Sequence, residues 1–434
     1  MKFGCMLRKF CSIRDTLVRF VLTIIIRSRL VNPWFQSKAG KEYICDCIIN
    51  YPRAAYLSAA TRRRFYWTYV TKRLFIQPYR RWRFYRREGR YPPALLAISP
   101  TTHCNLRCGG CYAAGRETQE LSRETVHRVL NEANAMGTSF FTIVGGEPFC
   151  WEPLLETLEQ FNTSLFLIYT NGTLITDDVA QRLAGAGNAL ITFSIEGYEE
   201  ETDRRRGAGT FATIIAAMDR LKRAGVRFGF SVTVTRHNNE TVASEAFIDY
   251  FTDIGCMSGC YFNYIPIGRE PDTELMPTPA QRDTRRRLLN RLRRGRNIIL
   301  FDFWNDGPLV CGCLGAGTNY LHINASGQVE PCVFYHFATD SIHDKTLLEV
   351  LNSPFFKTIR SQQKTCTNWI APCPIIDHPA LLRDAVREAD AQPTHDGAAQ
   401  FLDTLQAPLD RYGAAYRALA ETARLEEQQE NSSV

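Results

Sequence analysis

Three cysteines that stand close together have the residue type and the spacing to bind iron. Cys104, Cys108 and Cys111 follow the pattern C-x3-C-x2-C, and the apolar run 94–98 leads into them. Three thiolates can hold three irons of a cubane cluster, which leaves the fourth iron open to a small molecule. Zinc ribbons use paired C-x2-C knuckles instead, and bacterial ferredoxins keep a fourth cysteine nearby. The spacing therefore predicts an iron–sulfur cluster with one open iron.

The cysteine triplet resembles the signature of radical S-adenosylmethionine (SAM) enzymes, and further motifs follow in the order of that family. Residues 145–148 (GGEP) come directly after an apolar run and are similar to the family's GGE motif, which contacts the amino group of SAM. Glycines at this place permit a tight turn close to a ligand. Residues 169–172 (YTNG) and 194–197 (SIEG) resemble later family motifs around the SAM ribose and the substrate, and residues 203–207 (DRRRG) match a common loop of the family. The resemblance extends over residues 92–378.

This resemblance implies a cofactor, a reaction and a set of contacts. Cys104, Cys108 and Cys111 would hold a [4Fe-4S] cluster with SAM on its open iron. One electron from that cluster, delivered by a reductant such as flavodoxin or ferredoxin, would cleave SAM to a 5′-deoxyadenosyl radical that abstracts hydrogen from a substrate. The residues expected to contact SAM or to line the same mouth are Tyr112, Gly145, Gly146, Glu147, Pro148, Asn171, Ser194 and Glu196.

One position near the triplet departs from the family pattern. The family often has an aromatic residue just before the third cysteine, near the adenine of SAM, but this chain has Gly110 there. Tyr112 follows the cysteine instead. It can supply the missing contact, or it can be an ordinary packed aromatic.

The motifs follow short apolar runs that are typical of strands. Strands are expected over residues 95–99, 140–144, 165–170, 190–194, 228–234 and 261–265, and helices over residues 122–136, 153–161, 177–186, 211–224 and 241–254. Ser122 and Asp177 suit helix N-caps, and Gly225 and Gly255 suit helix ends. Alternating strands and helices predict a parallel sheet with helices outside it and a site at the C-terminal ends of the strands. Six such units match the partial (βα)6 TIM-like barrel of the resembled family, so the expected fold class is α/β.

A second group of cysteines lies near the C-terminal end of the resemblance. Cys313 is followed after 13 residues by Gly327, and Cys332 comes after four more, which resembles the opening of SPASM and twitch iron–sulfur extensions. Residues 324–327 (NASG) predict a hairpin turn that brings these two cysteines together. Cys373 would supply a third ligand to the same cluster.

The number of auxiliary clusters that we expect in this block follows from the SPASM cysteines that the chain lacks. The full SPASM run of cysteines is absent, so we expect one auxiliary iron–sulfur cluster and not two. Cys366 and Cys311 compete for the fourth ligand position, which can also be open. Buried structural thiols and a zinc site, which would use similar ligands, are the alternatives.

Charge is distributed unevenly along the chain. Residues 1–90 contain 21 of the 52 Lys and Arg residues but only 4 of the 45 Asp and Glu residues, a net charge of +17 against −10 for the remainder. Such asymmetry points to an anionic surface bound by the N-terminal part. Apolar residues recur at helical spacing at Phe10, Ile13, Leu17, Phe20, Val21, Ile24 and Ile25. The uninterrupted apolar run after Arg19 is too short to span a bilayer, which needs about 20 residues. The pattern therefore predicts an interfacial helix.

Residues 62–67 and 80–87 add a second membrane-like feature, because they interleave arginines with aromatic residues. Aromatic rings suit the headgroup layer, and each basic residue near it adds about 1 kcal/mol of attraction to anionic lipid. A helical cap with a solvated basic face is the alternative, and a nucleic-acid interface is disfavoured. We expect a cytoplasmic protein on the inner face of the membrane, since 15 cysteines without a recognisable secretory signal favour reduced thiols.

The sequence thus predicts a radical SAM enzyme, of oxidoreductase or transferase type, with four regions. These are a basic helical region at 1–90, a barrel at 91–300, an auxiliary-cluster domain at 301–378 and a helical tail at 379–434. The cationic N-terminus favours a membrane lipid or isoprenoid as substrate. The alternatives are a maturase that modifies peptide or protein side chains, as SPASM and twitch relatives often do, and a non-catalytic iron–sulfur scaffold or electron carrier.

Overall fold

The computed structural model describes residues 37–50, 56–57, 61–62, 76–114, 117–293, 296–315, 317–395 and 397–432. The interfacial helix predicted within residues 10–25 and most of the arginine-aromatic segment 62–67 lie outside these residues. None of the described helices is long and apolar enough to cross a membrane.

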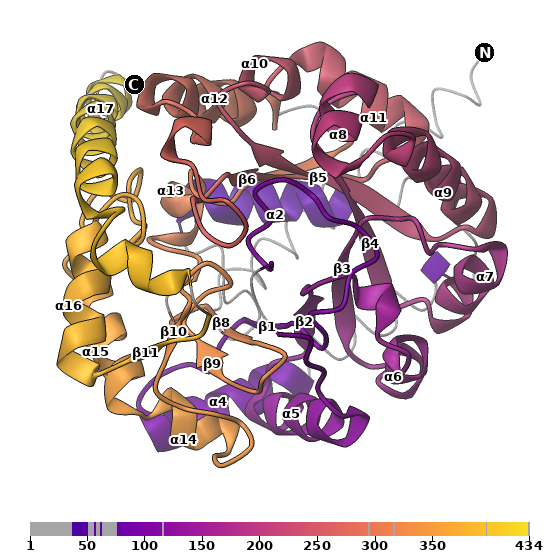
Figure 1. Ribbon diagram of the computed structural model, residues 1–434, viewed down its shortest axis with the longest axis horizontal. Coiled ribbons are helices and arrows are strands. Elements are labelled where there is room, and N and C mark those ends of the chain that lie inside the picture. The colour runs from indigo at the N-terminus through magenta and orange to yellow at the C-terminus, as the bar shows by residue number, and fades with distance from the viewer. Residues whose placement is uncertain are drawn as a thin grey trace, which may run out of the picture.

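A nine-stranded, mostly parallel sheet curves around the centre of the molecule (Figure 1). Its first seven strands are β1 (Leu95–Ile98), β2 (Phe140–Ile143), β3 (Leu165–Thr170), β4 (Ala189–Ile195), β5 (Arg227–Val234), β6 (Ser258–Asn263) and β7 (Ile299–Asp302). Each of them pairs in parallel with its neighbour in the chain. β8 (Tyr320–Ile323) then pairs in parallel with β1, and β9 (Val329–Glu330) pairs antiparallel with β8. The predicted α/β class with a parallel sheet is confirmed.

Helices connect the strands and cover the outside of the sheet (Figure 1). They are α5 (Arg123–Met136), α6 (Leu154–Gln160), α7 (Asp177–Ala186), α8 (Glu199–Arg206), α9 (Thr210–Ala224), α10 (Asn239–Val242), α11 (Glu245–Ile254) and α12 (Pro279–Leu292). The predicted caps explain several ends, since the Ser122 side chain accepts from Thr125 N and Gly225 closes α9 in the left-handed conformation. For α7 the predicted cap Asp177 is wrong by one residue, because Thr176 accepts from Val179 N.

Three further predictions about these elements need correction. The predicted helix 241–254 is two helices, because Ser244 caps α11 and interrupts the first. The segment 203–207, expected as a loop, is mostly the last turn of α8. The sheet also has a seventh parallel strand, β7, in addition to the six that were expected. The hairpin β8–β9 extends the same sheet at β1.

The C-terminal third packs against one side of the barrel. It contains α13 (Gly307–Val310), α14 (Leu347–Leu351), α15 (Pro354–Gln363), α16 (Pro379–Ala389) and α17 (Gln406–Ser432). Figure 1 shows α15, α16 and α17 side by side along that edge of the molecule. Tyr416 and Ala420 of α17 are fully buried, so this helix is part of the packed structure.

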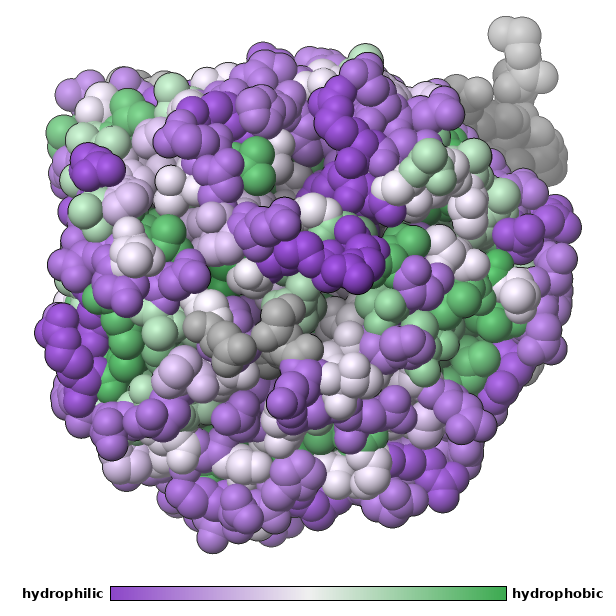
Figure 2. Space-filling view, viewed as in Figure 1, coloured by the Kyte–Doolittle hydropathy of each residue, from purple (hydrophilic) through white to green (hydrophobic). Residues whose placement is uncertain are grey.

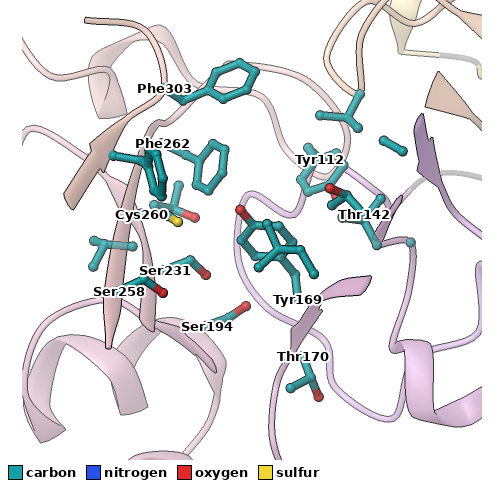
Figure 3. A pocket seen from close by; sticks show the side chains of 18 of the residues that line it. Tyr112, Thr142, Tyr169, Thr170, Ser194, Ser231, Ser258, Cys260, Phe262 and Phe303 are labelled. Carbon is teal, nitrogen blue, oxygen red and sulfur yellow. The ribbon is translucent and has the colours of Figure 1, made fainter. Parts of the chain in front are cut away.

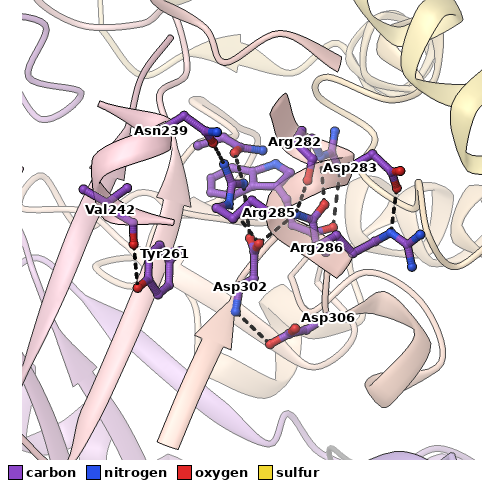
Figure 4. Close-up of polar contacts among 12 residues, drawn as sticks. Asn239, Val242, Tyr261, Arg282, Asp283, Arg285, Arg286, Asp302 and Asp306 are labelled. Atoms are coloured by element: carbon purple, nitrogen blue, oxygen red, sulfur yellow. Dashed lines mark hydrogen bonds and ion pairs between the residues drawn. The ribbon is translucent and has the colours of Figure 1, made fainter. Parts of the chain in front are cut away.

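Arginines buried on α12 join the barrel to this C-terminal part (Figure 4). Arg282 donates to both carboxylate oxygens of Asp377 at 2.5 and 3.1 Å, and its guanidinium lies 3.6 Å from the ring centroid of Tyr416. Arg285 pairs with Asp302 of β7 and donates to Asn263 Oδ1 at 2.6 Å. Each buried charge therefore has an opposite charge and further hydrogen bonds, as burial of ions requires.

Two N-terminal helices lie against the barrel. α2 (Lys38–Asn50) runs behind the sheet in Figure 1, where the Tyr43 hydroxyl donates to Leu300 O at 2.7 Å and accepts from Leu300 N at 2.8 Å. α4 (Gln77–Glu88) packs beside α5 through its buried residues Arg81 and Phe84.

Candidate active site

A cavity of about 400 Å³ runs along the axis of the barrel (Figure 3). Its floor is lined by the first residues of the strands, which include Leu95, Phe140 and Leu165, and its upper end by residues near their C-terminal ends, such as Thr170 and Thr233. Active sites of α/β barrels lie at this C-terminal end. The predicted site residues that line the cavity are Cys104, Cys108, Cys111, Tyr112, Gly145, Gly146, Glu147, Asn171 and Ser194.

Two predicted SAM-contact residues do not line this cavity. Pro148 is buried at the start of a short 3-10 turn, residues Pro148–Cys150. Glu196 is buried beneath two arginines, as described below. The geometry thus brings together most of the motifs that lie far apart in the sequence and leaves these two behind the cavity wall.

The glycines of the GGEP motif permit a close approach to the cysteine loop. Gly146 N donates to Thr101 O at 2.9 Å, and Glu147 N donates to His103 O at 2.8 Å. A Cβ atom on Gly146 would lie 2.5 Å from Thr102 O, and Gly145 has a φ of +121° that favours glycine. The motif therefore fixes the backbone that leads into Cys104.

Glu147 organises the end of β3 from within this motif. Its carboxylate accepts from Thr170 Oγ1 at 2.6 Å, from Asn171 N at 2.7 Å and from Phe149 N at 3.1 Å. Burial raises the pKa of Glu147, while these three hydrogen bonds act to lower it. Asn171 in turn donates to Asn105 Oδ1 at 2.9 Å, so the side chain is held beside the first cysteine.

Two arginines at the end of α8 hold the other side of the cysteine loop. Arg205 donates to Gly109 O at 3.0 Å and to Gly110 O at 3.2 Å. Arg205 and Arg206 both donate to Glu196 Oε1 at 2.6 Å. The other carboxylate oxygen, Glu196 Oε2, is buried and has no hydrogen-bond partner in the described structure. Both arginines line the cavity, and they belong to the DRRRG motif, which by itself predicts no contact for them.

Tyr264 fills the space beside Gly110 that the family pattern gives to an aromatic residue. A Cβ atom on Gly110 would lie 2.7 Å from Tyr264 Cε2, so the two positions compete for one volume. Tyr264 follows β6 and lines the cavity. Tyr112 also lines the cavity, but its ring packs 5.1 Å from the ring of Phe334 in the C-terminal part. An aromatic side chain thus lies beside Gly110, the residue before the third cysteine, although it comes from the segment that follows β6.

The three thiols fit an iron–sulfur cluster by their chemistry. All three are free cysteines, all are half-buried, and all face one cavity. Burial raises the pKa of Cys104 to about 11. It also raises the pKa of Cys108, against the opposite effect of Arg206 and Arg205. Cluster binding needs thiolates, so the nearby guanidinium groups favour the form that binds iron.

Deeper in the barrel the cavity wall is mainly apolar, with a few polar groups (Figure 3). Phe262 and Phe303, whose ring centroids are 5.3 Å apart, form part of it. Tyr169 faces Cys260, and burial raises the pKa of both, that of Cys260 to about 12. The outer face seen in Figure 2 is by contrast mostly hydrophilic, with hydrophobic side chains in separate patches. The barrel interior can therefore exclude water from a reacting group.

The structure places three cysteines of the C-terminal block around one cavity. Cys313, Cys332 and Cys373 line a second, smaller cavity together with aromatic and proline residues. The predicted hairpin is present, since residues 324–327 connect β8 to β9 and Gly327 has a φ of +78°. These thiols are free and fit the donor set of an iron–sulfur cluster. Cys366 and Cys311, the candidates for a fourth ligand, are not among the residues that line this cavity.

Two known families match the parts of the chain that contain these two groups of cysteines. Residues 98–247 match the radical SAM superfamily, and residues 311–374 match SPASM, an iron–sulfur cluster-binding domain. The first match contains the triplet and GGEP, and the second contains Cys313, Cys332 and Cys373.

Curated relatives match most of their length to this chain. It is 30% identical over 307 residues to mycofactocin maturase MftC of Mycobacterium ulcerans, which covers 64% of this chain and 79% of the relative. It is 25% identical over 305 residues to the AdoMet-dependent heme synthase of Methanosarcina barkeri, covering 63% and 86%. It is 28% identical over 351 residues to the cysteine-type anaerobic sulfatase-maturating enzyme of Clostridium perfringens, covering 65% and 88%.

A solved structure has the same fold. The crystal structure of Streptococcus suis SuiB bound to precursor peptide SuiA aligns with a TM-score of 0.55 and 19% identity, over 65% of this chain and 70% of SuiB. Proteins with these two domains bind a [4Fe-4S] cluster and SAM, and they also bind auxiliary iron–sulfur clusters. This chain therefore belongs to the radical SAM superfamily and is a radical SAM enzyme with a C-terminal SPASM domain.

Proposed function

We propose that this enzyme modifies a side chain of a peptide or protein. The observation that supports this most is that relatives found by sequence and by structure have names that indicate such substrates. They are a mycofactocin maturase, a sulfatase-maturating enzyme and a SuiB complex with its precursor peptide. The lipid or isoprenoid substrate that the N-terminal charge favoured has no such support, so it takes second place.

We assign the binding roles from the geometry. Cys104, Cys108 and Cys111 would hold the cluster, and the tight turn at Gly145 and Gly146, which lines the cavity, would let SAM approach the backbone. The cluster and SAM together supply the one-electron chemistry that removes a hydrogen atom from an unreactive carbon. Cys313, Cys332 and Cys373 would hold one auxiliary cluster.

The remaining side chains would position and protect these groups. Arg205 fixes the loop between the second and third cysteines through Gly109 O and Gly110 O. Glu147 orders the turn after β3, and Tyr264 supplies the aromatic surface beside the third cysteine. The apolar barrel interior would exclude water from the reacting carbon, which protects a reactive species from side reactions.

A stimulation assay separates the two substrate classes. The anaerobically reconstituted full chain is given reductant, SAM and either the small-peptide fraction or the total lipid extract of its source cells. We expect the peptide fraction to increase the formation of 5′-deoxyadenosine, and we expect proteinase treatment of that fraction to abolish the increase. Stimulation by the lipid extract that survives proteinase treatment would return the lipid hypothesis to first place.

We also propose that α4 contacts an anionic membrane surface. Tyr79 and Trp82 are 58% and 47% exposed on its outer face, although large aromatic side chains usually bury most of their surface. Their rings stack 6.2 Å apart, and Arg86 lies 6.0 Å from the ring of Trp82. Arg83 is exposed on the same face. Aromatic rings beside arginines suit the headgroup layer of an anionic bilayer.

Vesicle flotation tests this contact. The full chain should float with phosphatidylglycerol vesicles, and replacing Arg83 and Arg86 by alanine should weaken binding about 30-fold, because each basic residue contributes about 1 kcal/mol. The matched control replaces Arg182 and Arg223, two exposed arginines of α7 and α9, and should bind nearly as the parent does. Equal losses in both double variants would mean that net charge, and not α4, attracts the vesicle.

A further inference from the structure

The hydroxyl of Tyr320 lies between the barrel cavity and the smaller cavity of the auxiliary cysteines. Its oxygen is 2.8 Å from Cys332 Sγ, in a buried contact. Tyr320 lines the barrel cavity, whereas Cys332 lines the smaller cavity with Cys313 and Cys373. One side chain therefore forms the wall of the first cavity and touches a sulfur of the second.

The direction of this hydrogen bond follows from the chemistry of the cysteine, since by geometry alone either atom could be the donor. A cysteine that binds iron is a thiolate and has no proton to give. The hydroxyl proton of Tyr320 must then point to Cys332 Sγ. The other hydrogen bonds to these sulfurs come from backbone N–H groups, such as that of Ile375 to Cys373 at 3.4 Å.

We propose that Tyr320 tunes the reduction potential of the auxiliary cluster through this hydrogen bond. Reduction adds negative charge to a cluster and its thiolates, and a donor aimed at a ligand sulfur stabilises the more negative state. The bond therefore raises the potential. Hydrogen bonds from neighbouring groups commonly adjust metal ligands in this way.

The position of the ring extends this role to the substrate. The Tyr320 ring packs 6.0 Å from the ring of Phe303, and both line the barrel cavity. A substrate in that cavity would contact the same side chain that donates to Cys332. Tyr320 is thus a positioning residue that links the occupied cavity to the auxiliary cluster. This proposal rests on the three auxiliary cysteines, and it is independent of whether the substrate is a peptide.

The test measures the midpoint potential of the auxiliary cluster in the full chain. Replacing Cys104, Cys108 and Cys111 by alanine leaves the auxiliary cluster as the source of the signal, which is followed by electron paramagnetic resonance during a redox titration. Tyr320→Phe, which keeps the ring and removes the hydroxyl, should shift the midpoint to a more negative potential. The signal needs no substrate and no turnover.

Tyr335→Phe is the matched control. Tyr335 is also buried and lines the smaller cavity, but its hydroxyl donates to Leu382 O at 3.3 Å and not to a sulfur. We expect its midpoint to equal that of the parent. An unchanged midpoint in Tyr320→Phe, or the same shift in both variants, would overturn the proposal. So would loss of the cluster from Tyr320→Phe, because the tyrosine would then hold the site together instead of tuning it.

Discussion

Replacing Cys104, Cys108 and Cys111 together by alanine should abolish the cleavage of SAM. These are the three thiols that face the upper end of the barrel cavity, and an iron–sulfur cluster without its thiolate ligands does not form. We expect 5′-deoxyadenosine to fall to the level of a reaction without protein. Iron content should fall but not vanish, because the auxiliary cysteines are intact.

Cys150→Ala is the control for this variant. Cys150 is a free, half-buried cysteine near the GGEP motif, but it does not line the cavity. Its replacement should leave SAM cleavage close to that of the parent. Cleavage that persists in the triple variant would refute the assignment of the triplet. Complete loss in Cys150→Ala would show that the ligand set is larger than these three residues.

Arg282→Ala should cause a large loss of stability. The guanidinium and Asp377 are both completely buried, so the substitution leaves an uncompensated carboxylate in the interior. Breaking a buried pair in this way costs about 3–5 kcal/mol in the free energy of unfolding. Asp377 Oδ2 also accepts from Cys373 N at 3.0 Å, so the loop of an auxiliary cysteine should loosen as well.

Arg291→Ala on the same helix is the control for Arg282→Ala. Arg291 is exposed and pairs with Glu245 at 3.2 Å, a surface contact worth about 0–1 kcal/mol. Urea denaturation of both variants under anaerobic conditions measures the difference. Similar losses in the free energy of unfolding for the two variants would mean that the buried pair contributes no more to stability than the surface pair.

The parts of the site that lie in contiguous motifs could be predicted from the sequence. The triplet and GGEP each occupy a few consecutive residues after an apolar strand, and all of these residues except Pro148 line the cavity. Strand and helix alternation likewise predicted the parallel sheet, because periodicity is a local property of the chain. The hairpin that brings Cys313 to Cys332 was readable from a turn sequence between two short strands.

The rest depends on contacts between distant segments. Gly110 alone does not reveal that Tyr264 fills the space beside it, since the two meet only in the folded chain. No local motif marks Cys260, which lies on β6 and faces the cavity. Arginines such as Arg282 look like surface residues of a polar helix, and only the fold supplies the buried carboxylate that pairs with it.

The most direct test of the central claim follows the cluster of the triplet alone. In the full chain with Cys313, Cys332 and Cys373 replaced by alanine, the cluster at Cys104, Cys108 and Cys111 is the expected source of the reduced iron–sulfur signal in electron paramagnetic resonance. If SAM binds its open iron, addition of SAM should change the g values of that signal. A reduced cluster whose spectrum is identical with and without SAM would contradict the account.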